Sequence, residues 1–129
     1  MQFRLRTSKA TADRLKTLQN STGLTPNILC RISVSLSLRE SNKINITEVK
    51  DQGGLEFNRN TLTGTYDYVF KALITQYEGR EVSDEEYFPN LFLAHLERGV
   101  KLLENEYLYA GNYEKLIFNL LGKTEIGTA

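Results

Sequence analysis

Cysteine, histidine and proline are scarce in this chain of 129 residues, which contains one cysteine, one histidine and two prolines. A single cysteine, Cys30, excludes an intrachain disulfide and predicts a reducing, cytoplasmic environment. One histidine, His95, cannot supply a histidine-based metal cluster. The sequence also lacks a CxxC pair and a glycine-rich phosphate loop, so these motifs give no reason to expect a metal or another cofactor.

Long apolar stretches are missing as well. No run approaches the ~20 residues of a membrane-spanning helix. The opening segment "MQFRLRTSKATADR" lacks the apolar centre of a secretory signal. With 40% apolar and 25% charged residues the composition is that of an ordinary globular protein, and we expect one domain over residues 1–129.

The net charge is zero, but the charges are unevenly distributed. Residues 1–39 carry +6, from seven basic residues and Asp13, and the remaining residues carry −6. The basic residues of the first segment are Arg4, Arg6, Lys9, Arg14, Lys16, Arg31 and Arg39. This asymmetry indicates an anionic partner for the amino-terminal third, although a solvated charged face would give the same pattern.

The first elements read as a strand followed by a helix. In "QFRLRTS" the apolar Phe3 and Leu5 alternate with Gln2, Arg4 and Arg6, which predicts a short strand with a basic outer face. "SKATADRLKTLQNSTG" predicts a helix that is capped by Ser8 and stopped by Gly23. Its apolar stripe contains Ala12, Leu15 and Leu18.

The segment "NILCRISVSLSLRES" is ambiguous, because apolar residues and serines alternate strictly from Ile32 to Leu38 as in a half-buried strand. However, Thr25 and Pro26 just upstream form a good helix start. On a helical wheel the apolar residues fall into two opposite sectors with Ser33 and Ser37 between them. We therefore favour a helix buried on two faces, with its own domain as one neighbour and a second copy of the protein as the candidate for the other.

The rest of the chain predicts a largely helical half. Residues 41–64 read as loop with a possible short strand at 55–57, and Asp84, Glu85 and Glu86 as a solvated acidic run. Ser83 and Glu86 have capping-box spacing. Helices are expected at 65–77, 90–109 (ended by Gly111) and 112–121, followed by a frayed end. The fold class is thus mainly α, with a basic part over 1–41 that resembles ribbon-helix-helix proteins and a helical part over 60–122.

In ribbon-helix-helix proteins, two chains each contribute a strand to a ribbon that enters the DNA major groove. By this plan Arg4, Arg6, Lys9 and Lys16 would make most contacts with DNA phosphates. The helix start at Thr25 and Asn27 would be a second phosphate anchor. Arg14 and Arg31 complete the candidate DNA-binding set.

Beyond these local patterns, the chain resembles the DndE proteins of bacterial DNA sulfur modification along most of its length. The resemblance rests on "LRTSKATADRLKTLQNSTGLTPNILCRISVSLSL", "GLEFNRNTLTGTYDYVFKALI" and "HLERGVKLL", with "TGLTPNILCRI" the most characteristic piece. It implies a place in a multiprotein system that replaces a non-bridging phosphate oxygen of DNA with sulfur (phosphorothioation). It further implies a non-catalytic subunit that binds nicked duplex DNA, forms a dimer or tetramer, and works with the other proteins of the system.

Three alternatives stay open at this point: a ribbon-helix-helix transcriptional regulator, a nicking nuclease, and a scaffold whose basic face meets an acidic protein. Cys30 is a conceivable persulfide carrier, but it shares a helix face with Val34 and Leu38, which favours a buried structural thiol. A structural role is likewise favoured for His95, and Gly99 either permits close helix packing or weakens its helix.

Overall fold

The computed structural model describes residues 3–45 and 50–128, with side chains as far as Gly122, so the predicted outward position of Gln2 lies outside the described residues. The chain order is β1 (Arg4–Arg6), α1 (Lys9–Thr22), α2 (Pro26–Ser37), β2 (Glu56–Asn58), α3 (Arg59–Thr63), a 3₁₀ turn (Gly64–Tyr66), α4 (Asp67–Glu78), a π-helical turn (Glu86–Leu91), α5 (Phe92–Ala110) and α6 (Tyr113–Thr128). The predicted fold class, mainly α with a short amino-terminal strand, is confirmed. Within the described ranges, the helices are too short or too polar to cross a membrane.

The ends of α1 follow the predicted capping signals. The side chain of Ser8 accepts a hydrogen bond from the Thr11 N–H, and Gly23 closes the helix in the left-handed region at φ 78°. The buried face consists of Thr11, Leu15 and Leu18, while Ala12 is only half-buried.

The ambiguous segment is the helix α2, and the strand alternative is wrong. Six of its twelve side chains are buried: Leu29, Cys30, Ser33, Val34, Leu36 and Ser37. Its neighbours are α5, α3 and α1 of the same chain, while Ile28 stays exposed and Ile32 and Leu38 are only partly buried.

The two buried serines mark the place where α2 and α5 cross. A Cβ atom built on Gly99 of α5 would lie 1.8 Å from the Ser33 carbonyl oxygen, so only a glycine permits this approach. The serines therefore do more than separate two apolar sectors, because their small side chains let the two helices pack closely. Of the two interpretations of Gly99, close packing is the one that the structure supports.

The two strands form one antiparallel sheet, in which Leu5 pairs with Phe57 and Arg6 with Glu56. Leu5 and Phe57 are buried, and the residues on either side of them point outward. The short strand predicted near 55–57 is thus confirmed. β1 pairs with this strand of its own chain, whereas in the ribbon-helix-helix plan it would pair with a strand of a second chain.

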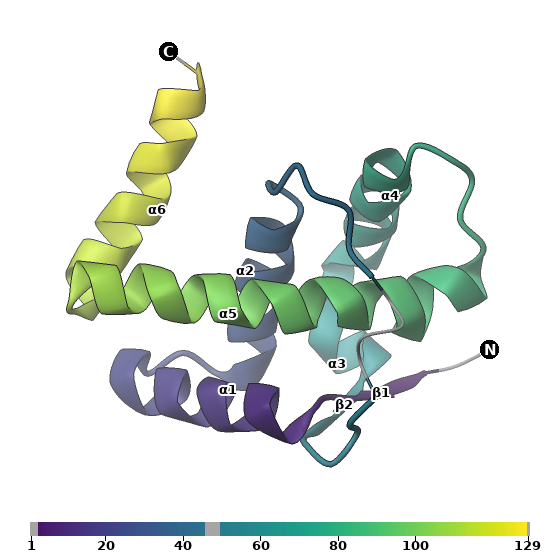
Figure 1. The fold of residues 1–129 in the computed structure, drawn as a ribbon, viewed down its shortest axis with the longest axis horizontal. Coiled ribbons are helices and arrows are strands. Elements are labelled where there is room, and N and C mark those ends of the chain that lie inside the picture. Colours follow the sequence, from purple (N-terminus) through teal and green to yellow (C-terminus); the bar gives the residue numbers. More distant parts are fainter. Residues whose placement is uncertain (1–2, 46–49, 129) are drawn as a thin grey trace.

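Figure 1 shows α5 crossing the centre of the molecule, with α1 below it, α2 behind it and the sheet at the amino-terminal end of α1. α5 ends before Gly111, and from there α6 extends away from the body of the molecule. The terminal residues expected to fray continue α6 to Thr128. In α4 only Phe70 and Ile74 are buried, so much of its predicted apolar stripe is exposed.

Candidate nucleic-acid interface

Two arginines form the outer face of β1. Arg4 and Arg6 flank the buried Leu5, and their side chains are 68% and 48% exposed. Glu56 of β2 contacts both: its Oε2 lies 3.4 Å from Arg4 Nη1 and its Oε1 lies 3.3 Å from Arg6 Nη2. Exposed ion pairs of this kind contribute about 0–1 kcal/mol, so a phosphate can compete with Glu56 for either guanidinium.

Two further cations, both lysines, are exposed on α1, the element that follows β1. Lys9 is the first residue of α1 and Lys16 lies seven residues further on, so both project from the same side of the helix, and both are exposed. Asp13 lies on the same side between them. Arg4, Arg6, Lys9 and Lys16, which we call the ribbon–α1 set, therefore occupy consecutive elements and are open to solvent.

Arg14 and Arg31 point into contacts within the fold instead. Arg14 Nε lies 3.3 Å from Glu104 Oε1 and thereby joins α1 to α5. Arg31 Nε donates to the Leu62 carbonyl at 2.8 Å and Nη2 to the Thr61 carbonyl at 3.0 Å. These carbonyls belong to the end of α3, so Arg31 caps that short helix.

Thr25 and Asn27 lie at the start of α2, beyond the turn that follows α1. In the chain, the 14 residues of α1 and this turn separate them from the sheet. The Thr25 side chain makes no capping hydrogen bond, and the residue is exposed. Any phosphate bound here would therefore be a separate contact from those of the ribbon–α1 set.

The start of α1 is occupied by two carboxylates that sequence reasoning missed. Glu97 Oε2 accepts from the Ser8 N–H at 2.9 Å, and Asp51 Oδ2 accepts from the Lys9 N–H at 2.9 Å. The hydrogen bond from Lys9 is the main cause that lowers the pKa of Asp51. An Asx-type turn, in which Gly53 donates to Asp51 Oδ1, was the available sequence signal for Asp51, while Glu97 had none.

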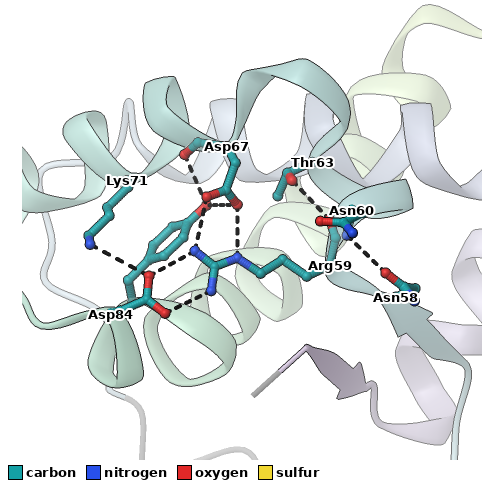
Figure 2. Close-up of polar contacts among 8 residues, drawn as sticks. Asn58, Arg59, Asn60, Thr63, Asp67, Lys71 and Asp84 are labelled. Carbon is teal, nitrogen blue, oxygen red and sulfur yellow. Dashed lines mark hydrogen bonds and ion pairs between the residues drawn. The ribbon is translucent and has the colours of Figure 1, made fainter. Parts of the chain in front are cut away.

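A second cluster missed by sequence reasoning holds β2, α3 and α4 together (Figure 2). The Arg59 guanidinium lies between Asp67 and Asp84, with Nη2–O distances of 2.9 and 2.8 Å, and Lys71 reaches Asp84 from α4. The hydrogen bonds from Arg59 lower the pKa of Asp84 to about 2. The prediction that Asp84 belongs to a solvated acidic run is therefore wrong. Asp84 instead anchors Arg59, the residue that follows the sheet.

The capping box of the same segment is confirmed. Ser83 N–H donates to Glu86 Oε1 at 3.3 Å and Glu86 N–H donates to Ser83 Oγ at 3.1 Å. Glu86 also pairs with Arg80 at 2.8 Å. Together with Asp84, this places two of the three acidic residues in specific contacts.

His95 is fully buried beside the α2–α5 crossing. Its Nδ1 lies 2.8 Å from Ser37 Oγ, and its ring packs edge-on against Tyr77. Burial, and next the charge of Arg98, lower the pKa of His95 to about 4, so the imidazole is neutral at pH 7. This position agrees with the structural role favoured from sequence. No group of three potential metal ligands occurs in the part of the chain that the structure describes.

Cys30 is also completely buried, in α2. Burial raises the pKa of its thiol far above the usual range. Since a reactive cysteine needs an accessible thiolate, the structure agrees with a structural thiol and gives no support to a persulfide carrier.

The architecture defines a class: a basic strand followed by two helices, a second strand that returns to pair with the first, and a helical carboxy-terminal half. Residues 4–110 match the family model of the DNA sulphur modification protein DndE. The chain belongs to the DndE family.

Two solved structures have the same fold. One is DndE from Escherichia coli B7A, described as involved in DNA phosphorothioation modification: the TM-score is 0.63 and the identity 22%, over 78% of this chain and 96% of that one. The other is a DndE mutant with two glycine-to-lysine substitutions, with a TM-score of 0.64 and 21% identity over 79% and 97% of the two chains. No curated protein sequence matches the chain. The family is thus involved in DNA phosphorothioation, and α6 lies beyond the residues that match its model.

Proposed function

We propose that this protein is a non-catalytic, cytoplasmic subunit of the DNA sulfur-modification machinery that binds duplex DNA, preferentially at a nick. The observation that carries the proposal is the ribbon–α1 set: four exposed cations on two consecutive elements, in a family that acts on DNA. Arg4 and Arg6 would contact the duplex from β1, and Lys9 and Lys16 would contact phosphates from α1. Thr25 and Asn27 would add a separate anchor, whereas Arg14 and Arg31 would act indirectly by holding α1 and α3 in place.

The salt dependence of binding tests the lysines. Each neutralised phosphate contributes about −0.9 to the slope of log K against log salt. Replacing Lys9 and Lys16 by alanine should therefore lower the affinity for a short duplex and reduce the slope by about 1 to 2. Lys115→Ala is the matched control, because Lys115 is exposed on α6. If the slope and the affinity of the double variant equal those of the wild type, Lys9 and Lys16 are not part of the interface.

A nick in the same duplex tests the finer claim. We expect tighter binding to the nicked duplex than to the intact one, independent of sequence. Equal affinities would remove the nick preference, and strong preference for one sequence would favour a transcriptional regulator instead.

The non-catalytic role has its own test. Supercoiled plasmid incubated with the protein and a divalent metal should stay supercoiled. Metal-dependent relaxation that is lost in the His95→Ala variant would identify a nicking nuclease.

We also propose that the protein works as a homo-oligomer, a dimer or a tetramer, and contacts other proteins of the same system. Large apolar side chains stay exposed at the end of α5 and on α6, among them Leu108, Tyr109 and Phe118. Exposed apolar patches of this kind often form protein–protein interfaces. The mass in solution, measured with and without nicked duplex, tests the assembly, and a monomer under both conditions would contradict it.

A further inference from the structure

A pocket of about 260 Å³ lies between α5 and residues 43–45 and 50–51, which belong to the segment connecting α2 to β2. Four cationic residues contribute to its wall: Lys43 and Lys50 from the connecting segment, and Arg98 and Lys101 from α5. Two carboxylates, Asp51 and Glu97, also line it. The pocket borders Ser8, at the start of α1, but none of the four cations belongs to the ribbon–α1 set.

The two carboxylates are engaged by donors outside this group of cations. Asp51 accepts from the backbone N–H groups of Lys9 and Gly53 at 2.9 and 2.8 Å. Glu97 Oε2 accepts from the Ser8 N–H, and its Oε1 accepts from the hydroxyls of Ser8 and Thr11 at 2.7 and 2.9 Å. Each carboxylate oxygen thus already has a partner, at the start of α1 or, for Asp51 Oδ1, in the turn that follows Asp51.

Two of the four cations, Arg98 and Lys43, donate hydrogen bonds to neutral acceptors. Arg98 donates to Ser37 Oγ at 2.8 Å, to the Ser37 carbonyl at 2.6 Å, to the Asn42 carbonyl at 2.5 Å and to the Tyr77 hydroxyl at 2.9 Å. Lys43 Nζ donates to the Tyr77 carbonyl at 2.6 Å and lies over its ring. Among the described residues, none of the four cations forms a salt bridge.

Arg98 is half-buried, and its four hydrogen bonds to neutral acceptors fix its orientation at the pocket wall. Among the described residues no carboxylate pairs with its guanidinium, so its positive charge is available to an anion. Lys50 and Lys101 are exposed and free to turn toward a ligand. The lining therefore combines two cations held by hydrogen bonds, Arg98 and Lys43, with two exposed lysines, an arrangement that suits a compact multivalent anion.

We propose that this pocket binds a tetrahedral oxyanion of the phosphate class, coordinated by Lys43, Lys50, Arg98 and Lys101. The volume lies below the ~300 Å³ at which pockets begin to hold drug-sized ligands, so it suits one phosphate group with its waters. Such a group is supplied either by free phosphate or by the phosphate of a nucleotide. The proposal does not depend on duplex binding by the ribbon–α1 set.

Inorganic phosphate is the first probe. Titration of the ¹⁵N-labelled full-length protein, at constant ionic strength with chloride as the reference, should shift the amide signals around Lys43 and from Arg98 to Lys101. In the double variant Lys50→Gln/Lys101→Gln, binding should weaken about tenfold or more, because two charged hydrogen bonds are lost. Both side chains are exposed, so the variant should keep the melting temperature of the wild type.

Matched variants separate this site from the duplex interface. Lys115→Gln, an exposed lysine on α6, and Lys9→Ala/Lys16→Ala should both keep wild-type phosphate affinity. If chloride causes the same shifts, or if the double variant binds phosphate as tightly as the wild type, the proposal is wrong. Loss of duplex affinity in Lys9→Ala/Lys16→Ala with unchanged phosphate binding would support both proposals independently.

A second arm identifies the source of the phosphate. A deoxynucleoside 5′-monophosphate should produce the same shifts at Arg98 and Lys101 as inorganic phosphate if the pocket takes a nucleotide phosphate. Shifts with inorganic phosphate alone would assign the pocket to the free anion. Either result supports an oxyanion pocket. If neither probe shifts the signals of Arg98 and Lys101, the proposal is wrong.

Discussion

Gly99 lies where α5 crosses α2, and its position leaves no room for a side chain. The nearest obstacle to a Cβ is backbone, the Ser33 carbonyl oxygen at 1.8 Å, which cannot rotate away as a flexible side chain would. α2 and α5 contribute many of the buried residues, so a shift here disturbs the centre of the core.

We therefore expect Gly99→Ala to lower the free energy of unfolding by at least about 2 kcal/mol, because overpacked sites relax only at the expense of backbone shifts. Urea denaturation monitored by circular dichroism measures the difference. Gly122→Ala is the control, since Gly122 is also helical but has open space around it, and it should leave stability unchanged or slightly raised. Equal effects of the two substitutions would show that the crossing is looser than described.

His95 makes the stability of the protein depend on pH. The folded state holds the imidazole neutral, with a pKa of about 4, whereas the unfolded chain binds a proton near pH 6.5. Below pH 6.5 the unfolded state thus takes up more protons, and folding stability falls as the pH drops toward 4, by about 3 kcal/mol over the whole window. Carboxyl groups such as Asp84, with a pKa of about 2, stay charged through this range.

Because His95 is the one histidine in the sequence, its ring signal in an NMR titration reports this pKa directly. We expect a midpoint near 4 and a urea midpoint that decreases from pH 7 to pH 5. A ring that titrates near 6.5, or stability that is flat between pH 7 and pH 5, would contradict the buried neutral imidazole.

At the scale of whole elements, the sequence predicted the ends of those helices that capping residues determine. Ser8 and Gly23 flank α1, Thr25 and Pro26 mark the start of α2, and Gly111 follows the end of α5, as their residue types indicate. The helix α3 was missed because its five residues lie in a segment rich in Asn, Thr and Gly, and because contacts with residues outside the helix hold it. Arg31 caps its end from α2, and Arg59 fixes its start to Asp67 and Asp84.

The Arg59 cluster gives a test at this scale (Figure 2). Arg59 is buried, and its removal would leave Asp67 and Asp84 without their main partner. We expect Arg59→Met to lower the free energy of unfolding by about 3 kcal/mol, because one partner of a buried ion pair is lost.

The matched control for this substitution is Arg80→Met. Arg80 also pairs with two acidic residues, Glu78 and Glu86, but its side chain is half exposed, so the expected loss is below about 1 kcal/mol. Urea denaturation of both variants measures the contrast. Similar losses would mean that burial of Arg59 adds nothing to the strength of its ion pairs.

Across the whole molecule, the fold partly cancels the charge asymmetry of the sequence. Acidic residues from the later part of the chain return to the basic amino-terminal third: Glu56 to Arg4 and Arg6, Asp51 and Glu97 to the start of α1, and Glu104 to Arg14. These contacts join residues 42 to 90 positions apart, so no local pattern could have revealed them. Of the eight candidate DNA-binding residues, the sequence alone could not separate the exposed ones from Arg14 and Arg31, which are used inside the fold.

This cancellation gives the last prediction, at the place where an acidic residue of β2 pairs with both arginines of β1. Glu56 lies against both arginines of β1, so it should oppose a phosphate approaching Arg4 or Arg6. We expect Glu56→Gln to raise the affinity for a short duplex about threefold at low salt, with a smaller gain at high salt as screening increases. Fluorescence anisotropy over a range of salt concentrations measures the effect.

Glu114→Gln is the control for Glu56→Gln, since Glu114 is an exposed acidic residue on α6 and its substitution makes the same change in net charge. If both variants gain equally, the effect is one of overall charge and not of the ribbon. If Glu56→Gln gains nothing and Arg4→Ala/Arg6→Ala loses nothing, β1 does not touch DNA, and duplex binding would have to depend on α1 and the start of α2. A gain confined to Glu56→Gln would place the duplex against the sheet, because no other described acid contacts both Arg4 and Arg6.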